Sequence, residues 1–202
     1  ITGIVLFSAL GARQGDVVLA ANSVLWNLFL IGGFFLDGFA TAAETLCGQA
    51  VGAGDREAFD AAAALSLRWC LGFGLAVSLV SLAGGPAFID AVTTNGPVRE
   101  AAQSYLVLAA LAPLAAAAPF AYDGIYIGAT WTRAMRNLMV CALAAYCAIL
   151  ALVESLGFGN TGLWLAFVSF LGARGLGQAI AFPRLARDTF RTPAPAALEP
   201  AA

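Results

Sequence analysis

The chain has 202 residues, of which 61% are hydrophobic and 11% are charged, and its formal net charge is −2. Soluble domains are about 45–50% apolar and about 25% charged, so this composition predicts an all-α polytopic membrane protein rather than a soluble one. The sequence contains no lysine and no histidine, which argues against a phosphate-loop ATPase and against an enzyme with the usual general base. The small net charge indicates no nucleic-acid surface.

Apolar runs separated by polar or glycine-rich breaks predict six helices in a transmembrane bundle. They are expected at residues 1–12, 18–51, 58–83, 98–129, 133–156 and 161–182. The first is shorter than the roughly 20 residues that cross a bilayer, so we expect a truncated span and a chain that is a fragment of a longer protein. The third is expected to end at Gly84-Gly85-Pro86, and residues 188–202 are expected to form a disordered cytoplasmic tail after a lobe of residues 1–187.

The arginines predict the orientation of the helices. Seven of them follow the second, fourth and sixth helices or flank those connections: Arg56, Arg68, Arg133, Arg136, Arg184, Arg187 and Arg191. The opposite side carries only Arg13 and Arg99. By the positive-inside rule, both chain ends are expected in the cytoplasm, with the protein in the cell's inner (plasma) membrane.

The second helix carries two acids inside an apolar sequence. Asp37 and Glu44 are seven residues apart, which places them on one helix face within about 20°. An acid inside a membrane span costs about 2.5 kcal/mol or more, which suggests ion or proton handling in a polar cavity. The alternatives are an ion pair with an arginine for Asp37 and an interfacial, water-reaching carboxylate for Glu44.

The fourth helix contains a second group of candidates. Pro119, Asp123, Tyr126 and Thr130 are spaced at i, i+4, i+7 and i+11 and are expected to share one face, with Tyr122 close by. Pro119 cannot donate to the carbonyl of the preceding turn, so we expect a bend there and a free acceptor. A carboxylate, a phenol, a hydroxyl and a carbonyl could bind a proton or a hard cation such as Na⁺. The alternative is a proline kink with an incidental Asp.

Arg174 is a lone cation near the middle of the sixth helix. An unpaired charge there is costly, so we predict that it pairs with Asp37 or Asp123. Gly172, Gly175 and Gly177 would allow close approach of a neighbouring helix. The alternative is that Arg174 extends to the cytoplasmic interface.

The cysteines and most aromatic residues are assigned packing roles. Cys47, Cys70, Cys141 and Cys147 show no C-x-x-C spacing, so neither a metal site nor a redox pair is indicated. Trp131 and Trp164 are expected to be anchors at the membrane interface.

Two segments resemble the multidrug and toxic compound extrusion (MATE) transporters. The first is LAANSVLWNLFLIGGFFLDGFATAAETLCGQAVGAGDREAF, which resembles the second helix of a six-helix repeat in that family. The second is FAYDGIYIGATWTRAMRN, which resembles the DinF-like branch. L-D-G-F-A together with D-G-I-Y-I-G-A-T points to the carboxy-terminal repeat, and the resemblance extends to about Arg187.

The resemblance implies one lobe of a twelve-helix, V-shaped antiporter that works by alternating access. Its partners would be an amino-terminal six-helix lobe, the lipid bilayer and small organic, often cationic and amphipathic substrates, with H⁺ or Na⁺ as the coupling ion and no other cofactor. Asp123 lies near the acid that NorM-like members use for cation binding. The seventh-helix glutamate of NorM-like members has no counterpart in residues 1–12, which favours protons over Na⁺.

Three functional hypotheses follow. The leading one is cation-coupled multidrug efflux, with Asp123 and Asp37 as coupling acids and with Arg174, Tyr126, Tyr122, Thr130 and Glu44 in supporting roles. The second is a flippase for a lipid-linked intermediate, which a cavity rich in arginine would favour. The third is a non-transporting membrane assembly protein, in which every buried charge would be paired.

Overall fold

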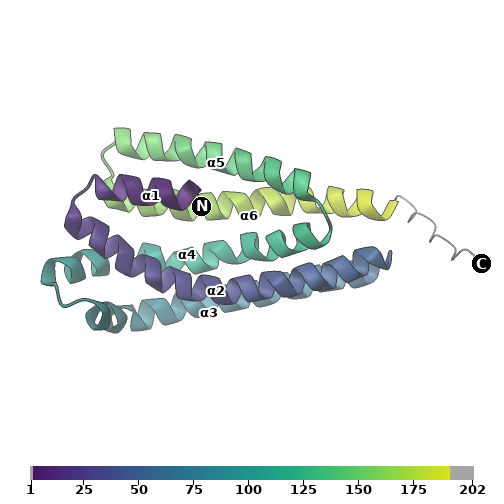
Figure 1. The fold of residues 1–202 in the computed structure, drawn as a ribbon, viewed down its shortest axis with the longest axis horizontal. Helices are drawn as coiled ribbons and strands as arrows, with labels where there is room; N and C mark the ends of the chain where they lie inside the picture. The colour runs from purple at the N-terminus through teal and green to yellow at the C-terminus, as the bar shows by residue number, and fades with distance from the viewer. Residues whose placement is uncertain (1, 192–202) are drawn as a thin grey trace, which may run out of the picture.

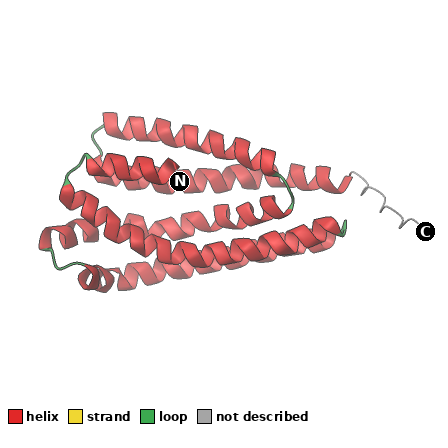
Figure 2. Ribbon diagram, viewed as in Figure 1, coloured by secondary structure: helices red, strands yellow, loops and turns green. Residues whose placement is uncertain are grey.

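The computed structural model describes residues 2–191, which form six α-helices and no strand within that range (Figures 1 and 2). The helices are α1 (Thr2–Ala12), α2 (Asp16–Gly52), α3 (Arg56–Val92), α4 (Gly96–Gly128), α5 (Thr132–Ser155) and α6 (Gly159–Arg191). The expected all-α, six-helix bundle is therefore confirmed.

Helix α4 lies at the centre of the bundle. It packs against α2, α3 and α6, whereas α5 packs mainly against α6, and α1 lies against α2 and α6 (Figure 1). Half of the most apolar 18-residue window of α4 is buried inside the bundle, compared with 17% for α5. Residues in the buried part of α4 therefore contact several neighbouring helices.

Five of the described helices, α2 to α6, are long and apolar enough to cross a membrane. Helix α2 has 37 residues, which corresponds to about 55 Å at about 1.5 Å per residue and exceeds the roughly 30 Å hydrocarbon core. Helix α1 has 11 residues.

The helices begin and end at residues whose chemistry suits a cap or turn. Asp55 accepts a hydrogen bond from the backbone N–H of Ala58 (2.9 Å) and caps α3, and Asn95 caps α4 through Val98 (3.3 Å). Between α2 and α3 the chain turns at Gly54, whose φ of +69° favours glycine. These contacts satisfy backbone donors that a helix start leaves unpaired.

Two helices extend further than the sequence predicts. Helix α3 continues through Gly84, Gly85 and Pro86 to Val92, and Gly85 packs closely on the side chain of Leu106 in α4. A Cβ at Gly85 would lie 2.6 Å from Cδ1 of Leu106. The expected end of this helix at residue 83 is therefore wrong.

Helix α6 likewise passes Pro183 and ends at Arg191. Residues 188–191 are therefore helical, which contradicts the predicted start of a disordered tail at residue 188. They are tied to the bundle, because Thr189 accepts a hydrogen bond from Nε1 of Trp131 (2.9 Å). The rest of the predicted tail, residues 192–202, lies outside the described residues.

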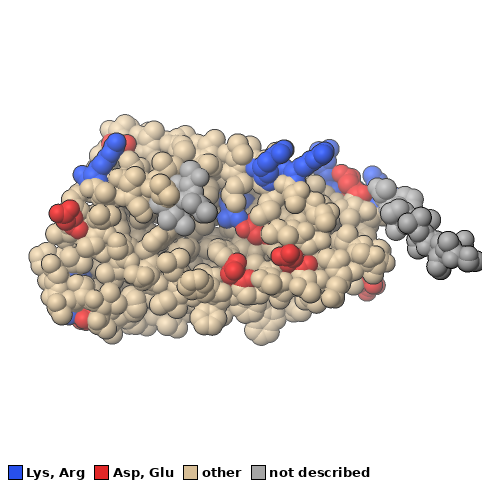
Figure 3. Space-filling view, in the orientation of Figure 1, with Lys and Arg blue, Asp and Glu red and all other residues tan. Residues whose placement is uncertain are grey.

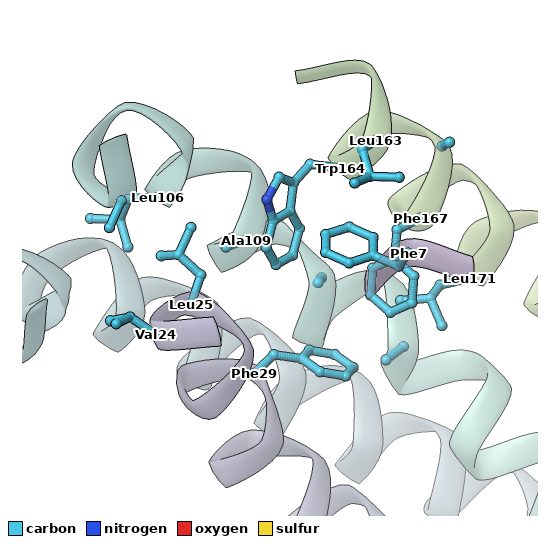
Figure 4. Close-up of a cluster of buried hydrophobic side chains, with 14 of the residues drawn as sticks. Phe7, Val24, Leu25, Phe29, Leu106, Ala109, Leu163, Trp164, Phe167 and Leu171 are labelled. Carbon is cyan, nitrogen blue, oxygen red and sulfur yellow. The ribbon is translucent and has the colours of Figure 1, made fainter. Parts of the chain in front are cut away.

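An aromatic cluster joins α1, α2 and α6 (Figure 4). The ring of Phe7 lies 4.9 Å from that of Trp164 and 5.8 Å from that of Phe167, and Phe29 of α2 lies 5.6 Å from Phe167. Trp164 is fully buried, so its expected role as an interface anchor is wrong. The sequence suggested a surface role because Trp164 lies close to the start of a predicted span, but the neighbouring α1 covers it.

A buried amide pair fixes α2 to α6 beside this cluster. Asn22 and Asn160 donate to each other's side-chain oxygens (2.7 and 2.9 Å), and Nε1 of Trp164 donates to Oδ1 of Asn22 (3.0 Å). Both asparagines are less than 5% exposed. Each amide is thus satisfied only while the two helices stay in this register.

We expect Asn160→Ala to lower the free energy of unfolding by about 1–3 kcal/mol, because it leaves the buried Asn22 amide without its partner. The matched control is Asn27→Ala, since Asn27 is exposed and bonds only to the Ser23 carbonyl of its own helix. Thermal denaturation of the purified protein in detergent would measure both. Equal melting temperatures for the two variants would contradict a stabilising role for the amide pair.

Candidate functional site

The candidate site is an ion pair between α4 and α6. The guanidinium of Arg174 (Nη2) donates to Oδ2 of Asp123, and Nε2 of Gln178 donates to Oδ1 of the same carboxylate at 2.8 Å. The side chains of Arg174 and Asp123 are 12% and 20% exposed. The predicted pairing of Arg174 with Asp123 is confirmed, and it offsets the cost of both charges inside apolar helices.

Helix spacing explains why these residues meet. Arg174 and Gln178 are one turn apart on α6, so both side chains point to the same face. Between them Gly175 lies against Pro119 of α4, where a Cβ would be 2.9 Å from the proline Cδ. Because Gly175 has no side chain, α6 lies close enough to α4 for both polar groups to reach Asp123, as expected for this glycine.

The other two glycines of α6 are not needed for this close approach. A Cβ at Gly172 would have no atom within 4 Å, and a Cβ at Gly177 would make only an ordinary contact.

Tyr126 forms a third bond between the two helices. Its hydroxyl donates to the backbone carbonyl of Gln178 at 2.7 Å, and its ring is fully buried. This bond fixes α6 to α4 at a second point, about one turn after Asp123 along α4. Tyr126 supports the site through α6, and its hydroxyl bonds to Gln178 and not to Asp123.

A seam of small residues places α2 beside the ion pair. Gly124 packs on the backbone of Ala40, and Gly128 packs on the backbone of Glu44. The offset is four residues on both helices, so α2 and α4 run in the same direction with backbones in contact. The two glycines belong to the segment D-G-I-Y-I-G, and their spacing is the small-xxx-small pattern of close helix pairs.

The two acids of α2 lie on the outside of this lobe. Asp37 and Glu44 are both exposed, and neither forms an ion pair with any residue in the described range 2–191. Asp37 thus does not pair with Arg174 or Asp123. Figure 3 shows acidic side chains near the middle of one face, with a basic side chain next to them and mostly uncharged surface around the group. Asp37 and Glu44 therefore offer negative charge that the lobe itself does not neutralise.

Thr130 and Tyr122 lie near the site without joining it. Thr130 is exposed in the turn after α4, with a φ of +60°, because the helix ends at Gly128. The expectation that it shares a face with Asp123 is therefore wrong. Tyr122 is buried on α4 against the rings of Tyr126 and Phe182. Pro119 is buried where it meets α6.

Sequence reasoning missed Gln178. The amide is a direct partner of Asp123 and is 2% exposed. A signal was present, because Gln178 is the polar residue four positions after Arg174 in an apolar stretch. Searching the helix face of Arg174 for polar companions would have found it.

Within residues 2–191, no group of three or more His, Cys, Asp or Glu side chains could hold a metal ion. Two cavities of about 290 and 300 Å³ lie between α1 and α5, beside the ion pair of Arg13 and Glu154 (3.3 Å). Neither is lined by Asp37, Glu44 or Asp123. The two acids of α2 are therefore arranged on an open face of the lobe and not around either of these cavities.

Comparison with known proteins gives consistent matches. The MatE family model matches residues 2–153. DNA damage-inducible protein F of Escherichia coli (strain K12) is 35% identical over 177 residues, which cover 88% of this chain and 38% of that protein. Protein DETOXIFICATION 42 of Arabidopsis thaliana is 28% identical over 92% of this chain and 35% of its own length. The chain thus spans little more than a third of the length of these two relatives.

Proposed function

Because the chain belongs to the MatE family, we propose that it forms the carboxy-terminal six-helix lobe of a cation-coupled exporter of organic compounds. The predicted family resemblance, including its DinF-like character, is confirmed by the family match and by the similarity to the E. coli protein. The family and the five apolar helices support a multi-pass membrane protein that is a transporter rather than an enzyme. The coupling ion, the antiport and the second lobe belong to the proposal.

The observation that carries the proposal is the Asp123–Arg174 ion pair beside the unpaired acids of α2. When Asp123 takes up a proton, it loses the charge that holds Arg174. The released arginine has to find other negative charge or water, so conformations that hydrate it or bring it to another acid become more populated. Proton binding would thereby shift the lobe between two states through differential affinity.

Asp37 and Glu44 would attract the cationic part of a substrate. Phe34 precedes Asp37 by about one turn and is 75% exposed, and Thr41 follows it by one turn. An exposed ring beside a carboxylate suits a cation that is also amphipathic, since the ring contacts apolar groups or the charge itself. Asp123, whose oxygens are occupied by Arg174 and Gln178, has the coupling role and not the substrate-binding one.

The distribution of arginines predicts on which side of the membrane each helix end would lie. The connections after α2 and α4 and the end of α6 would face the cytoplasm, in the cell's inner membrane. The lobe would pair with an amino-terminal six-helix lobe, and the acidic face of α2 would line the chamber between them.

The two other hypotheses have no specific observation in their favour. A flippase for a lipid-linked intermediate would use free arginines to bind phosphate, but Arg174 is already paired with Asp123. An assembly protein would pair its charges, but Asp37 and Glu44 are unpaired within the described residues.

Efflux from proteoliposomes tests the proposal. Proteoliposomes that contain the complete transporter would be loaded with a fluorescent organic cation. Either a proton gradient or a Na⁺ gradient would then be imposed across their membrane. We expect export driven by the proton gradient, and a loss of about tenfold or more in apparent affinity for the cation with Asp37→Asn, since a direct hydrogen bond to a charged group contributes about 1.5–3 kcal/mol. Export under a Na⁺ gradient alone would contradict proton coupling, and unchanged affinity would contradict the role of Asp37.

A further inference from the structure

The amide of Gln178 is buried with one end bonded and the other end free. Its Nε2 donates to Oδ1 of Asp123 at 2.8 Å, while its Oε1 has no hydrogen-bond partner in the described part of the chain. The residue is 2% exposed. Buried polar atoms are nearly always paired, so a free acceptor beside a charged carboxylate requires an explanation.

The hydrogen-bonding chemistry of the two side chains supplies one. An ionised carboxylate only accepts hydrogen bonds, so it pairs with Nε2, whereas a protonated carboxyl group also has an O–H to donate, which Oε1 can accept. A half-turn of the amide exchanges its two ends. Nε2 bonds to the ionised carboxylate and Oε1 bonds to the protonated carboxyl group, so each charge state keeps one hydrogen bond to Gln178.

Arg174 differs from Gln178 in this respect. A guanidinium has donors but no acceptor, and its attraction to Asp123 depends on the negative charge. Within residues 2–191, the charged side chains in the inner parts of the helices packed on α4 are Asp37 and Glu44 on α2, Arg68 on α3 and Arg174 on α6, with Arg133 and Arg136 at the start of α5. Of these, only Arg174 forms an ion pair with Asp123, and the nearby phenol of Tyr126 bonds to the backbone of Gln178.

We propose that Gln178 is a positioning residue that holds Asp123 in both charge states. It donates from Nε2 to the ionised carboxylate and, after its amide turns, accepts from the protonated acid at Oε1. Uptake of one proton then releases Arg174 from Asp123 without separating α4 from α6. This inference rests on the proposed coupling role of Asp123.

The backbone of Gln178 is fixed while its side chain turns. The hydroxyl of Tyr126 holds the Gln178 carbonyl at 2.7 Å, and Gly175 keeps α6 in contact with Pro119 one turn away. Only the terminal amide has to rotate, so the change stays within the site.

The test is the pH profile of transport in the complete protein. Gln178→Leu removes a bond from both forms of Asp123, but the bond to the ionised form is the stronger one. We therefore expect the pH of half-maximal proton-driven export to rise by about one unit. Gln178→Met, a flexible apolar replacement of similar length, provides a second variant if leucine disturbs folding. The matched control is Gln49→Leu, because Gln49 is an exposed glutamine on α2.

The results distinguish the positioning role of Gln178 from the coupling role of Asp123. A pH profile that moves in both Gln178 variants and not in Gln49→Leu supports the inference. Lower protein yield with an unchanged profile would overturn it, since a merely structural role affects amount and not pH dependence. If Asp123→Asn exports like the wild type, the proposed coupling role fails instead, whatever the Gln178 variants do.

Discussion

Gly124→Val should prevent the lobe from folding to a stable bundle. A Cβ at this position would lie 2.8 Å from the carbonyl carbon of Ala40 and 3.0 Å from its Cα. These are backbone atoms, so no side chain can move aside and α2 must separate from α4. Overpacking of this kind typically costs about 1–3 kcal/mol, and loss of the α2–α4 seam adds to it.

The amount of monodisperse transporter extracted from membranes, together with its melting temperature, measures this effect. The matched control is Gly72→Val on α3, where a Cβ would have no atom within 4 Å. We expect near-normal yield for Gly72→Val and little or no folded protein for Gly124→Val. Similar yields and melting temperatures for the two variants would contradict the close contact between α2 and α4.

Arg174→Gln and Asp123→Asn should each destabilise the protein, because each leaves its partner charge alone among apolar helices. Breaking a buried pair from one side typically costs about 3–5 kcal/mol, and the partial exposure of this pair places it at the lower end. The double variant removes both charges and should regain most of the stability. It should not regain transport, because no group at position 123 can then take up a proton.

Melting temperature and export rate, measured on the same preparations, separate the two roles of the pair. Stability restored without export is the expected result for the double variant. Stability restored together with wild-type export would show that the pair only holds α4 to α6. The control is the exposed pair Arg56–Asp60, whose removal should change neither quantity, since surface pairs contribute about 0–1 kcal/mol.

The helix pattern could be predicted from the sequence because each membrane span is a continuous apolar stretch, which local hydropathy detects. The same holds for the partner of Arg174, since an isolated charge in an apolar helix has few candidates and Asp123 was one of two. That Asp37 and Glu44 lie on one side of α2 follows from their seven-residue spacing, which fixes a shared face in any α-helix.

The remaining features depend on contacts between distant helices. Gly84-Gly85-Pro86 looks like a helix end locally, but α3 stays helical there, with Gly85 packed on Leu106. Trp164 is buried because Phe7 of α1 covers it. Periodicity places Thr130 on the face of Asp123, but α4 ends two residues earlier. These three features depend on which distant residues lie in contact, and a single sequence does not show those contacts.

Proton movement driven by substrate is the most direct test of coupling at Asp123. Proteoliposomes that contain the complete transporter and an internal pH-sensitive dye would receive a pulse of an organic cation that the wild type exports. We expect proton flow opposite to the cation in the wild type and none above leak in Asp123→Asn, with cation binding retained through Asp37. Equal proton flow in wild type and Asp123→Asn would contradict the proposed role of the Asp123–Arg174 pair.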